Sequence, residues 1–285
     1  MKSALNLFLI CLLFNKLSFA QTPEPAQAQA TYHFIYVRDT TDRKHPYTEN
    51  LLLLLGRNAS ACTSIDARTQ QETFVKQIQD QVKNAADPNH LNLTISAQRP
   101  VSDEYFQFFT THKLFSKKKL LNDFLIEEPI PVINWKISSD TLTISGLHCQ
   151  KAAAHFKGRD YEVWFCADLP FRSGPWKLQG LPGLIVQAAD KNREIVFEFA
   201  GIEQVSDQQL MVKLPEEVIR TTEKEFERLQ EVRKTNPAAF SKIAGKSPKS
   251  ALDDIDVSRI SSMNVTASTE SFSKKINNPI ELPEK

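Results

Sequence analysis

Glycine is scarce in this sequence, with eight residues in 285. Phosphate-binding loops and propeller blades depend on recurrent glycines, so this scarcity disfavours both. Charge of one sign is not in excess either, because 35 basic residues balance 34 acidic ones. A nucleic-acid-binding protein shows a basic surplus, and we therefore predict no nucleic-acid partner.

Long apolar runs are also missing, except near the start of the chain. Residues 5–14 (LNLFLICLLF) follow a short basic start, and Ser18-Phe19-Ala20 fits the small-x-small pattern of signal cleavage. The apolar run is too short for a convincing transmembrane span. We therefore predict a signal peptide over residues 1–20 and an exported protein, periplasmic or extracellular, that is not integral to the membrane.

Cysteine is limited to four residues, of which Cys62, Cys149 and Cys166 remain after signal removal. An exported protein can form a disulfide, but an odd count leaves one thiol over. A four-residue turn at 157–160 would place Cys149 diagonal to Cys166, whereas a shifted turn would place them opposite. A Cys149–Cys166 bridge, a bridge from Cys62 to either, and buried thiols all remain open. The chain has no CxxC, HxH or HExxH spacing, so we expect no metal and no cofactor.

The rest of the chain favours an α+β fold with a predominantly antiparallel, curved sheet and a few packing helices. Residues 21–30 read as a disordered leader, 31–245 as a single β-rich domain and 246–285 as a largely disordered tail. Helices are expected over 69–86 and from 215 to about 233, where they would cover the apolar face of the sheet. Strands are expected at 31–38, 51–55, 91–95, 105–109, 113–115, 121–126, 132–137, 141–144, 150–156, 161–167, 184–189 and 194–200.

Three of the eight glycines lie within the thirteen residues GPWKLQGLPGLIV, 174–186. Pro182-Gly183 suits a type II turn, in which proline fixes φ and glycine takes a positive φ. We predict a packed corner that leads into the strand 184–189. Surface loops with aromatic residues often bind partners, so the corner is also a candidate binding site. Its residues are Gly174, Pro175, Trp176, Gly180, Leu181, Pro182, Gly183, Leu184 and Ile185.

A hairpin precedes this corner, with β-prone runs at 150–156 and 161–167. Arg159 and Asp160 at its turn, with Tyr161 and Trp164 behind them, are a second candidate binding site. The alternative is an ordinary charged hairpin tip that keeps a sheet edge soluble.

The hexapeptide GLPGLI at 180–185 resembles the signature of the GLPGLI family, exported proteins found largely in the Bacteroidota. Similar segments include LLLLLGRNAS (51–60), CQKAAAHFKGRDYEVWF (149–165), GPW (174–176) and NNPIEL (277–282). The resemblance implies a periplasmic or cell-surface protein that is often encoded near outer-membrane transport receptors. It implies no established enzymatic activity.

The sequence leaves three hypotheses about function. The leading hypothesis is a non-enzymatic binding or accessory module whose partner is an outer-membrane receptor or another envelope protein. The second is a small hydrolase or a thiol- or metal-dependent enzyme, although no activating motif such as GxSxG is present. The third is a periplasmic carrier of an apolar ligand, which requires a cavity of several hundred Å³.

Overall fold

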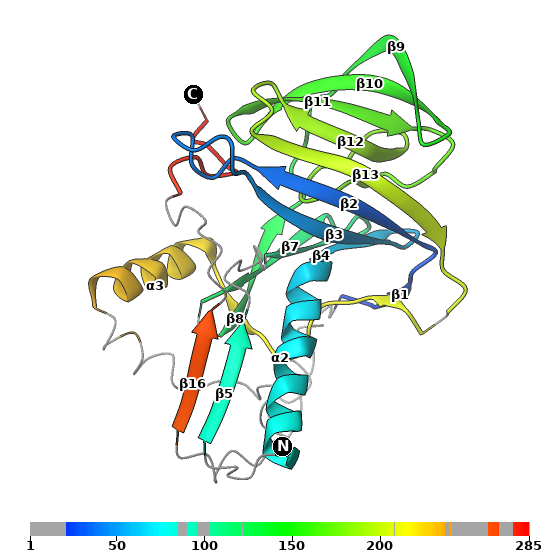
Figure 1. The fold of residues 1–285 in the computed structure, drawn as a ribbon. Coiled ribbons are helices and arrows are strands. Elements are labelled where there is room, and N and C mark those ends of the chain that lie inside the picture. The colour runs from blue at the N-terminus through cyan, green and yellow to red at the C-terminus, as the bar shows by residue number, and fades with distance from the viewer. Residues whose placement is uncertain are drawn as a thin grey trace, which may run out of the picture.

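A computed structural model describes residues 21–84, 90–95, 103–120, 122–207, 209–236, 240, 262–267 and 276–284. Its main feature is one twelve-stranded sheet in the order β15-β8-β7-β6-β4-β3-β2-β13-β12-β11-β10-β9 (Figure 1). Neighbouring strands run antiparallel, apart from the parallel pair of β15 and β8. The predicted β-rich fold with few helices is therefore confirmed in outline, but the sheet is mixed.

The strands of this sheet are β2 (Ala28–Tyr36), β3 (Tyr47–Leu55), β4 (Ala59–Ser64), β6 (Glu104–Phe108), β7 (Lys113–Lys119), β8 (Asp123–Pro129), β9 (Lys136–Ile144), β10 (Leu147–Phe156), β11 (Arg159–Cys166), β12 (Leu184–Asp190), β13 (Ile195–Gln204) and β15 (Ile219–Thr221). Two further pairs lie outside it: β1 (Glu24–Pro25) with β14 (Met211–Val212), and β5 (His90–Ile95) with β16 (Ser262–Ala267).

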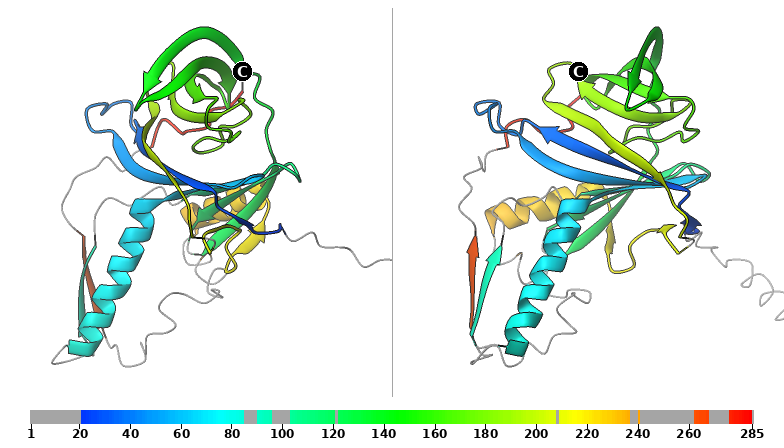
Figure 2. Two further views of the ribbon diagram at one scale, coloured as in Figure 1. Left: turned by 90° about the vertical axis from the view of Figure 1, so that its right-hand side faces the viewer. Right: turned by 45° about the vertical axis from the view of Figure 1, so that its right-hand side comes forward.

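The large sheet is strongly curved, so that β9 to β12 curl back above β2 and β3 (Figure 2). Alternating residues of β2 point into this curl and are buried, among them Tyr32 and Phe34. Phe34 stacks on Phe197 of β13 with ring centroids 4.8 Å apart. The main core is therefore enclosed by the sheet itself.

The helices do not cover this core, which corrects our prediction. The first, α2 (Ile65–Asn84), starts directly after β4 and projects away from the sheet (Figures 1 and 2). The second, α3 (Glu223–Thr235), packs against β8 through the ring contact of Phe226 with Phe124. Its N-cap is Thr222, whose side chain accepts a hydrogen bond from the Glu225 amide, so the helix begins later than the predicted Pro215.

Described elements extend beyond the predicted limits of the domain, 31–245. Ala28 and Ala30 of the supposed leader are fully buried in β2, because this strand pairs with both β3 and β13. Within the supposed tail, residues 262–267 form β16, and Asn278 is buried near the end of the chain. The predicted signal peptide, residues 1–20, lies outside the described residues.

Candidate functional site

The corner at 180–184 is present, but its backbone differs from our prediction. Strand β12 begins at Leu184, as expected. The left-handed conformations belong to Gly180 (φ +94°) and Trp176 (φ +58°), and not to Gly183. Glycine is needed at 183 for another reason: a Cβ there would lie 2.2 Å from the carbonyl oxygen of Cys166. The two backbones approach too closely for any side chain.

The segment before this corner fills the interior of the curled sheet. Trp176, Leu178 and Leu181 are each at most 2% exposed and belong to the main core. The Trp176 ring lies 5.4 Å from that of Phe156 and 6.0 Å from that of Tyr161. The Trp176 side chain is therefore part of the core, and of the predicted corner residues only Gly180 and Pro182 are exposed.

The hairpin of β10 and β11 is tighter than predicted. Phe156 pairs directly with Arg159, and the two-residue turn between them has positive φ at Lys157 (51°) and Gly158 (71°). Arg159 and Tyr161 point inward and are buried, while Trp164 is half-buried. Of the two charged residues predicted at this turn, Arg159 lies inside the fold, whereas Asp160 is exposed.

The Arg159 guanidinium holds the end of the chain. It donates to Asp190 at 2.9 Å and to Glu194 at 3.3 Å. It also donates to the Asn278 side chain at 2.6 Å and to the carbonyl oxygens of Pro279 and Ile280. We call residues 277–284 the C-terminal strap. Arg159 therefore links this strap to the acidic residues Asp190 and Glu194 of the curled sheet and its loop.

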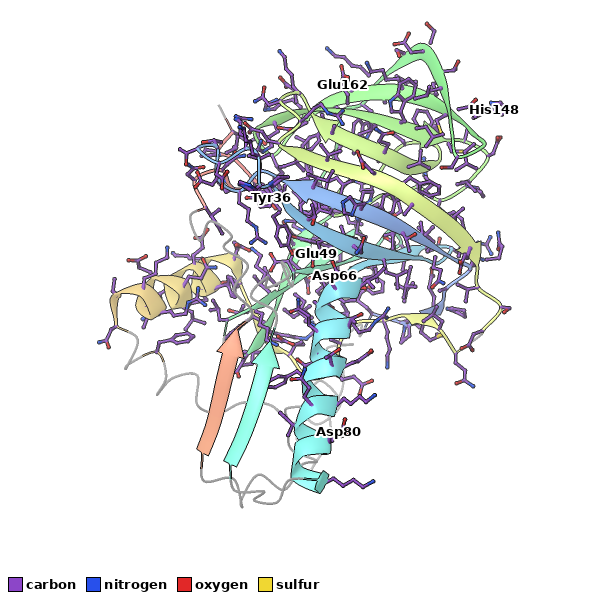
Figure 3. All side chains as sticks on the ribbon, viewed as in Figure 1. Tyr36, Glu49, Asp66, Asp80, His148 and Glu162 are labelled. Atoms are coloured by element: carbon purple, nitrogen blue, oxygen red, sulfur yellow. The ribbon has the colours of Figure 1, made fainter. Side chains whose placement is uncertain are left out.

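Further contacts secure the strap at both ends. The Tyr36 hydroxyl, labelled in Figure 3, donates to the Asn278 carbonyl oxygen. The Leu282 amide donates to the Lys157 carbonyl at 3.0 Å, beside the hairpin turn. A Cβ at Gly158 would lie 2.7 Å from the strap, so the turn glycine also allows this close approach.

A buried lysine forms the second charged centre. The Lys177 side chain is 4% exposed, and its Nζ lies 2.6 Å from Glu128 and 2.9 Å from Glu281 of the strap. Burial alone would lower the pKa of Lys177, but Glu281 and Glu128 outweigh it and the pKa is raised. Polar Lys177 and Gln179 alternate with apolar Trp176 and Leu178 in the sequence, but the chain turns at Trp176 and all four residues are buried.

A small cavity of about 30 Å³ lies beside Trp176 and Ile280, the chain neighbours of Lys177 and Glu281. It has room for roughly two water molecules. Most of its lining is aromatic or aliphatic: Phe34, Leu51, Tyr105, Trp176, Phe197 and Ile280. Asp103 and Cys62 also line it, and their ionisation matters for any chemistry there. Burial raises the pKa of Asp103 to about 6 and that of Cys62 to about 12. The Cys62 thiol is thus protonated and a poor nucleophile at neutral pH.

A buried carboxylate, Glu49, lies on β3 near the start of α2 (Figure 3). It is 2% exposed, and burial raises its pKa to about 7, with Asp66 adding to the rise and Ser64 and Tyr47 opposing it. Nothing in the sequence around Glu49 marks it as an inward-facing residue of β3.

The described residues bring together no group of three His, Cys, Asp or Glu side chains suited to a metal ion. The three cysteines among the described residues are buried free thiols. His155 contacts Asp160 at the exposed hairpin, whereas His148 lies at the far end of β10 (Figure 3). Within the described part of the chain, no helix is both long and apolar enough to cross a membrane.

The free edge of the large sheet is the other candidate site. Strand β9 pairs with β10 on one side, and no described strand pairs with its other side. Large apolar side chains are exposed here: Val132 (86%) just before β9, and Ile137 (47%) and Leu142 (46%) on it. The pairing shifts register between Gln150 and Ala152, which leaves a bulge in β9 before residue 141.

Comparison with known proteins identifies no family for this chain. No family model matches the chain, and no curated protein matches it. Two solved structures of PNGF-II, in two crystal forms, resemble it with TM-scores of 0.47 and 0.48 at 13% sequence identity. The match covers 71% of this chain but 32% of theirs, so this chain spans about a third of the length of PNGF-II.

Proposed function

We propose that this chain is an exported, non-enzymatic binding module that docks an extended segment of a partner protein along β9. The observation that carries the proposal is the open edge of β9 with its exposed apolar residues. An unpaired edge presents backbone N–H and C=O groups that another strand can engage.

Residues 141–144 of β9 are the part best suited to strand addition. They pair with β10 in continuous register, from Thr141 opposite Gln150 to Ile144 opposite Leu147. The bulge before them limits the regular edge to a short segment, which favours a short partner strand over extended aggregation. Leu142 and Ile137 then supply apolar contacts for the partner's side chains.

The two alternatives receive less support from the geometry. An enzyme that uses cysteine needs a thiol with a lowered pKa, but burial raises the pKa of Cys62 to about 12 and that of Cys149 to about 11. A carrier of an apolar ligand needs several hundred Å³ of enclosed space. The cavity beside Trp176 measures about 30 Å³.

The proposed partner is a protein of the bacterial envelope. An outer-membrane transport receptor is the specific candidate, and it rests on the resemblance to the GLPGLI family and on no residue of β9. Export itself rests on the predicted signal peptide.

Affinity capture from envelope fractions tests the proposal, using the tagged chain from Gln21 onward. The double variant Ile137→Asp, Leu142→Asp charges the β9 surface. The matched control is Ile276→Asp, because Ile276 is similarly apolar and 62% exposed but directly precedes the strap and does not belong to β9. We expect one envelope protein to be recovered with the unmodified chain and the control, and lost with the double variant. Equal recovery with all three, or none with any, would refute docking at β9.

A further inference from the structure

Cys149 and Cys166 lie at neighbouring ends of paired strands. The recorded register of β10 and β11 runs from Phe156 opposite Arg159 to Gln150 opposite Phe165. Extending this register by one residue brings Cys149 opposite Cys166. The two-residue turn therefore places the cysteines directly opposite, where the four-residue turn that we predicted would have placed them diagonally.

The geometry of this pair follows from the turn. Positive φ at both turn residues is typical of a type I′ hairpin, whose closing pair, here Phe156 and Arg159, is hydrogen-bonded. Antiparallel pairs alternate between hydrogen-bonded and non-hydrogen-bonded types. Counting along the ladder makes Cys149–Cys166 a non-hydrogen-bonded pair, with Cα atoms about 4.5 Å apart. This separation lies within the range of about 4.4–6.8 Å seen in disulfides.

Both strands continue through these residues. Cys149 also pairs with Leu142 of β9, and Cys166 with Leu184 of β12, so neighbouring strands hold each cysteine in the sheet. Cys62 belongs to another strand, where its sulfur accepts a hydrogen bond from the Trp176 amide at 3.4 Å. Both cysteines of the pair are buried, at 2% and 0% exposure, and both are thiols in the structure.

We propose that Cys149 and Cys166 are a modification site, a pair that forms a cross-strand disulfide during folding under oxidising conditions. The thiolate of one cysteine attacks a disulfide oxidant and releases one thiol of that oxidant. The second cysteine then attacks the mixed disulfide, the protein S–S bond forms, and the other oxidant thiol leaves. The two cysteines lose two protons and two electrons, and the oxidant is reduced to two thiols.

The timing follows from burial. Burial of Cys149 in the folded chain raises its pKa to about 11, with Cys166 adding to the rise, so little thiolate is available there. Oxidation therefore precedes the closure of this strand end. Once formed, the bond links β10 covalently to β11. Strand β10 is the neighbour of β9, the proposed docking strand.

The test refolds the chain from Gln21 onward in a buffer of reduced and oxidised glutathione. Free thiols are then alkylated in denaturant, and the digest is analysed by mass spectrometry. We expect a Cys149–Cys166 cross-linked peptide, a mass lower by two hydrogens and an alkylated Cys62. Alkylation of all three cysteines, or a cross-link that includes Cys62, would overturn the proposal.

Alanine variants separate the pair from the third cysteine. Cys62→Ala should keep the loss of two hydrogens, whereas Cys149→Ala and Cys166→Ala should each abolish it. The bond should also raise the Tm by about 5–10 °C, because it restricts the conformations of the unfolded chain. A dithiol reductant should reverse this rise. An oxidised form that melts no higher than the reduced form would show that the bond does not fit the native strands.

Discussion

Removal of the Arg159 guanidinium directly tests how much the contact between β11 and the C-terminal strap stabilises the fold. The side chain is 3% exposed and contacts Asp190, Glu194 and three strap residues. Arg159→Met keeps the aliphatic stem but leaves the buried Asp190 carboxylate without its cationic partner, whereas Glu194 keeps Arg43. Breaking a buried ion pair from one side costs about 3–5 kcal/mol. For a chain of this size that corresponds to a fall in Tm of about 6–20 °C.

Arg43 provides a matched control, because it contacts the same Glu194 from a position that is 54% exposed. Arg43→Met should cost about 0–1 kcal/mol, since solvent screens an exposed pair. Both variants are compared with the unmodified chain by thermal denaturation followed by circular dichroism. Similar losses in the two variants would refute the claim that burial gives Arg159 its role.

The same pair of variants makes a prediction about pH. Burial alone would raise the pKa of Glu194, but hydrogen bonds from Arg43 and Arg159 outweigh it and lower the pKa below 4.5. A carboxyl group with a lowered pKa in the folded state stabilises the fold above its unfolded pKa, and this stability is lost as the pH falls through the folded value. The acid loss of stability below about pH 4.5 should therefore be smaller in Arg159→Met.

Three further changes test separate parts of the fold. Gly183→Ala should cost about 1–3 kcal/mol in urea denaturation because its Cβ would meet the Cys166 carbonyl, whereas Gly201→Ala, with 3.8 Å to its nearest neighbour, should change little; equal effects would contradict the close approach. Glu49, with a pKa near 7, should make the fold less stable by up to about 3 kcal/mol as the pH rises from 4.5 through 7, and Glu49→Gln should flatten that slope. Phe226→Ala should raise hydrogen exchange across α3 while leaving the core strands protected, and a uniform increase would show that α3 is integral to the core.

Local patterns in the sequence predicted most strands of the large sheet. The strand predicted at 194–200 corresponds to β13, and the start of β12 at Leu184 followed from the corner before it. These features depend on side-chain period and turn chemistry, which act over a few residues. The resemblance to the GLPGLI family adds expectations about location and partners that still await experiment.

Only the tertiary structure decided which faces are buried. Lys177 and Gln179 looked like the polar side of an extended segment, yet the sheet curls around them and Glu128 and Glu281 neutralise the lysine. Arg159 likewise looked like a surface residue, because its partners at 190, 194 and 278–280 are distant in sequence. The register of the hairpin, and with it the opposition of Cys149 and Cys166, depended on one turn whose length the sequence left open. Burial and ion pairing arise from contacts between distant segments, and local sequence carries no record of them.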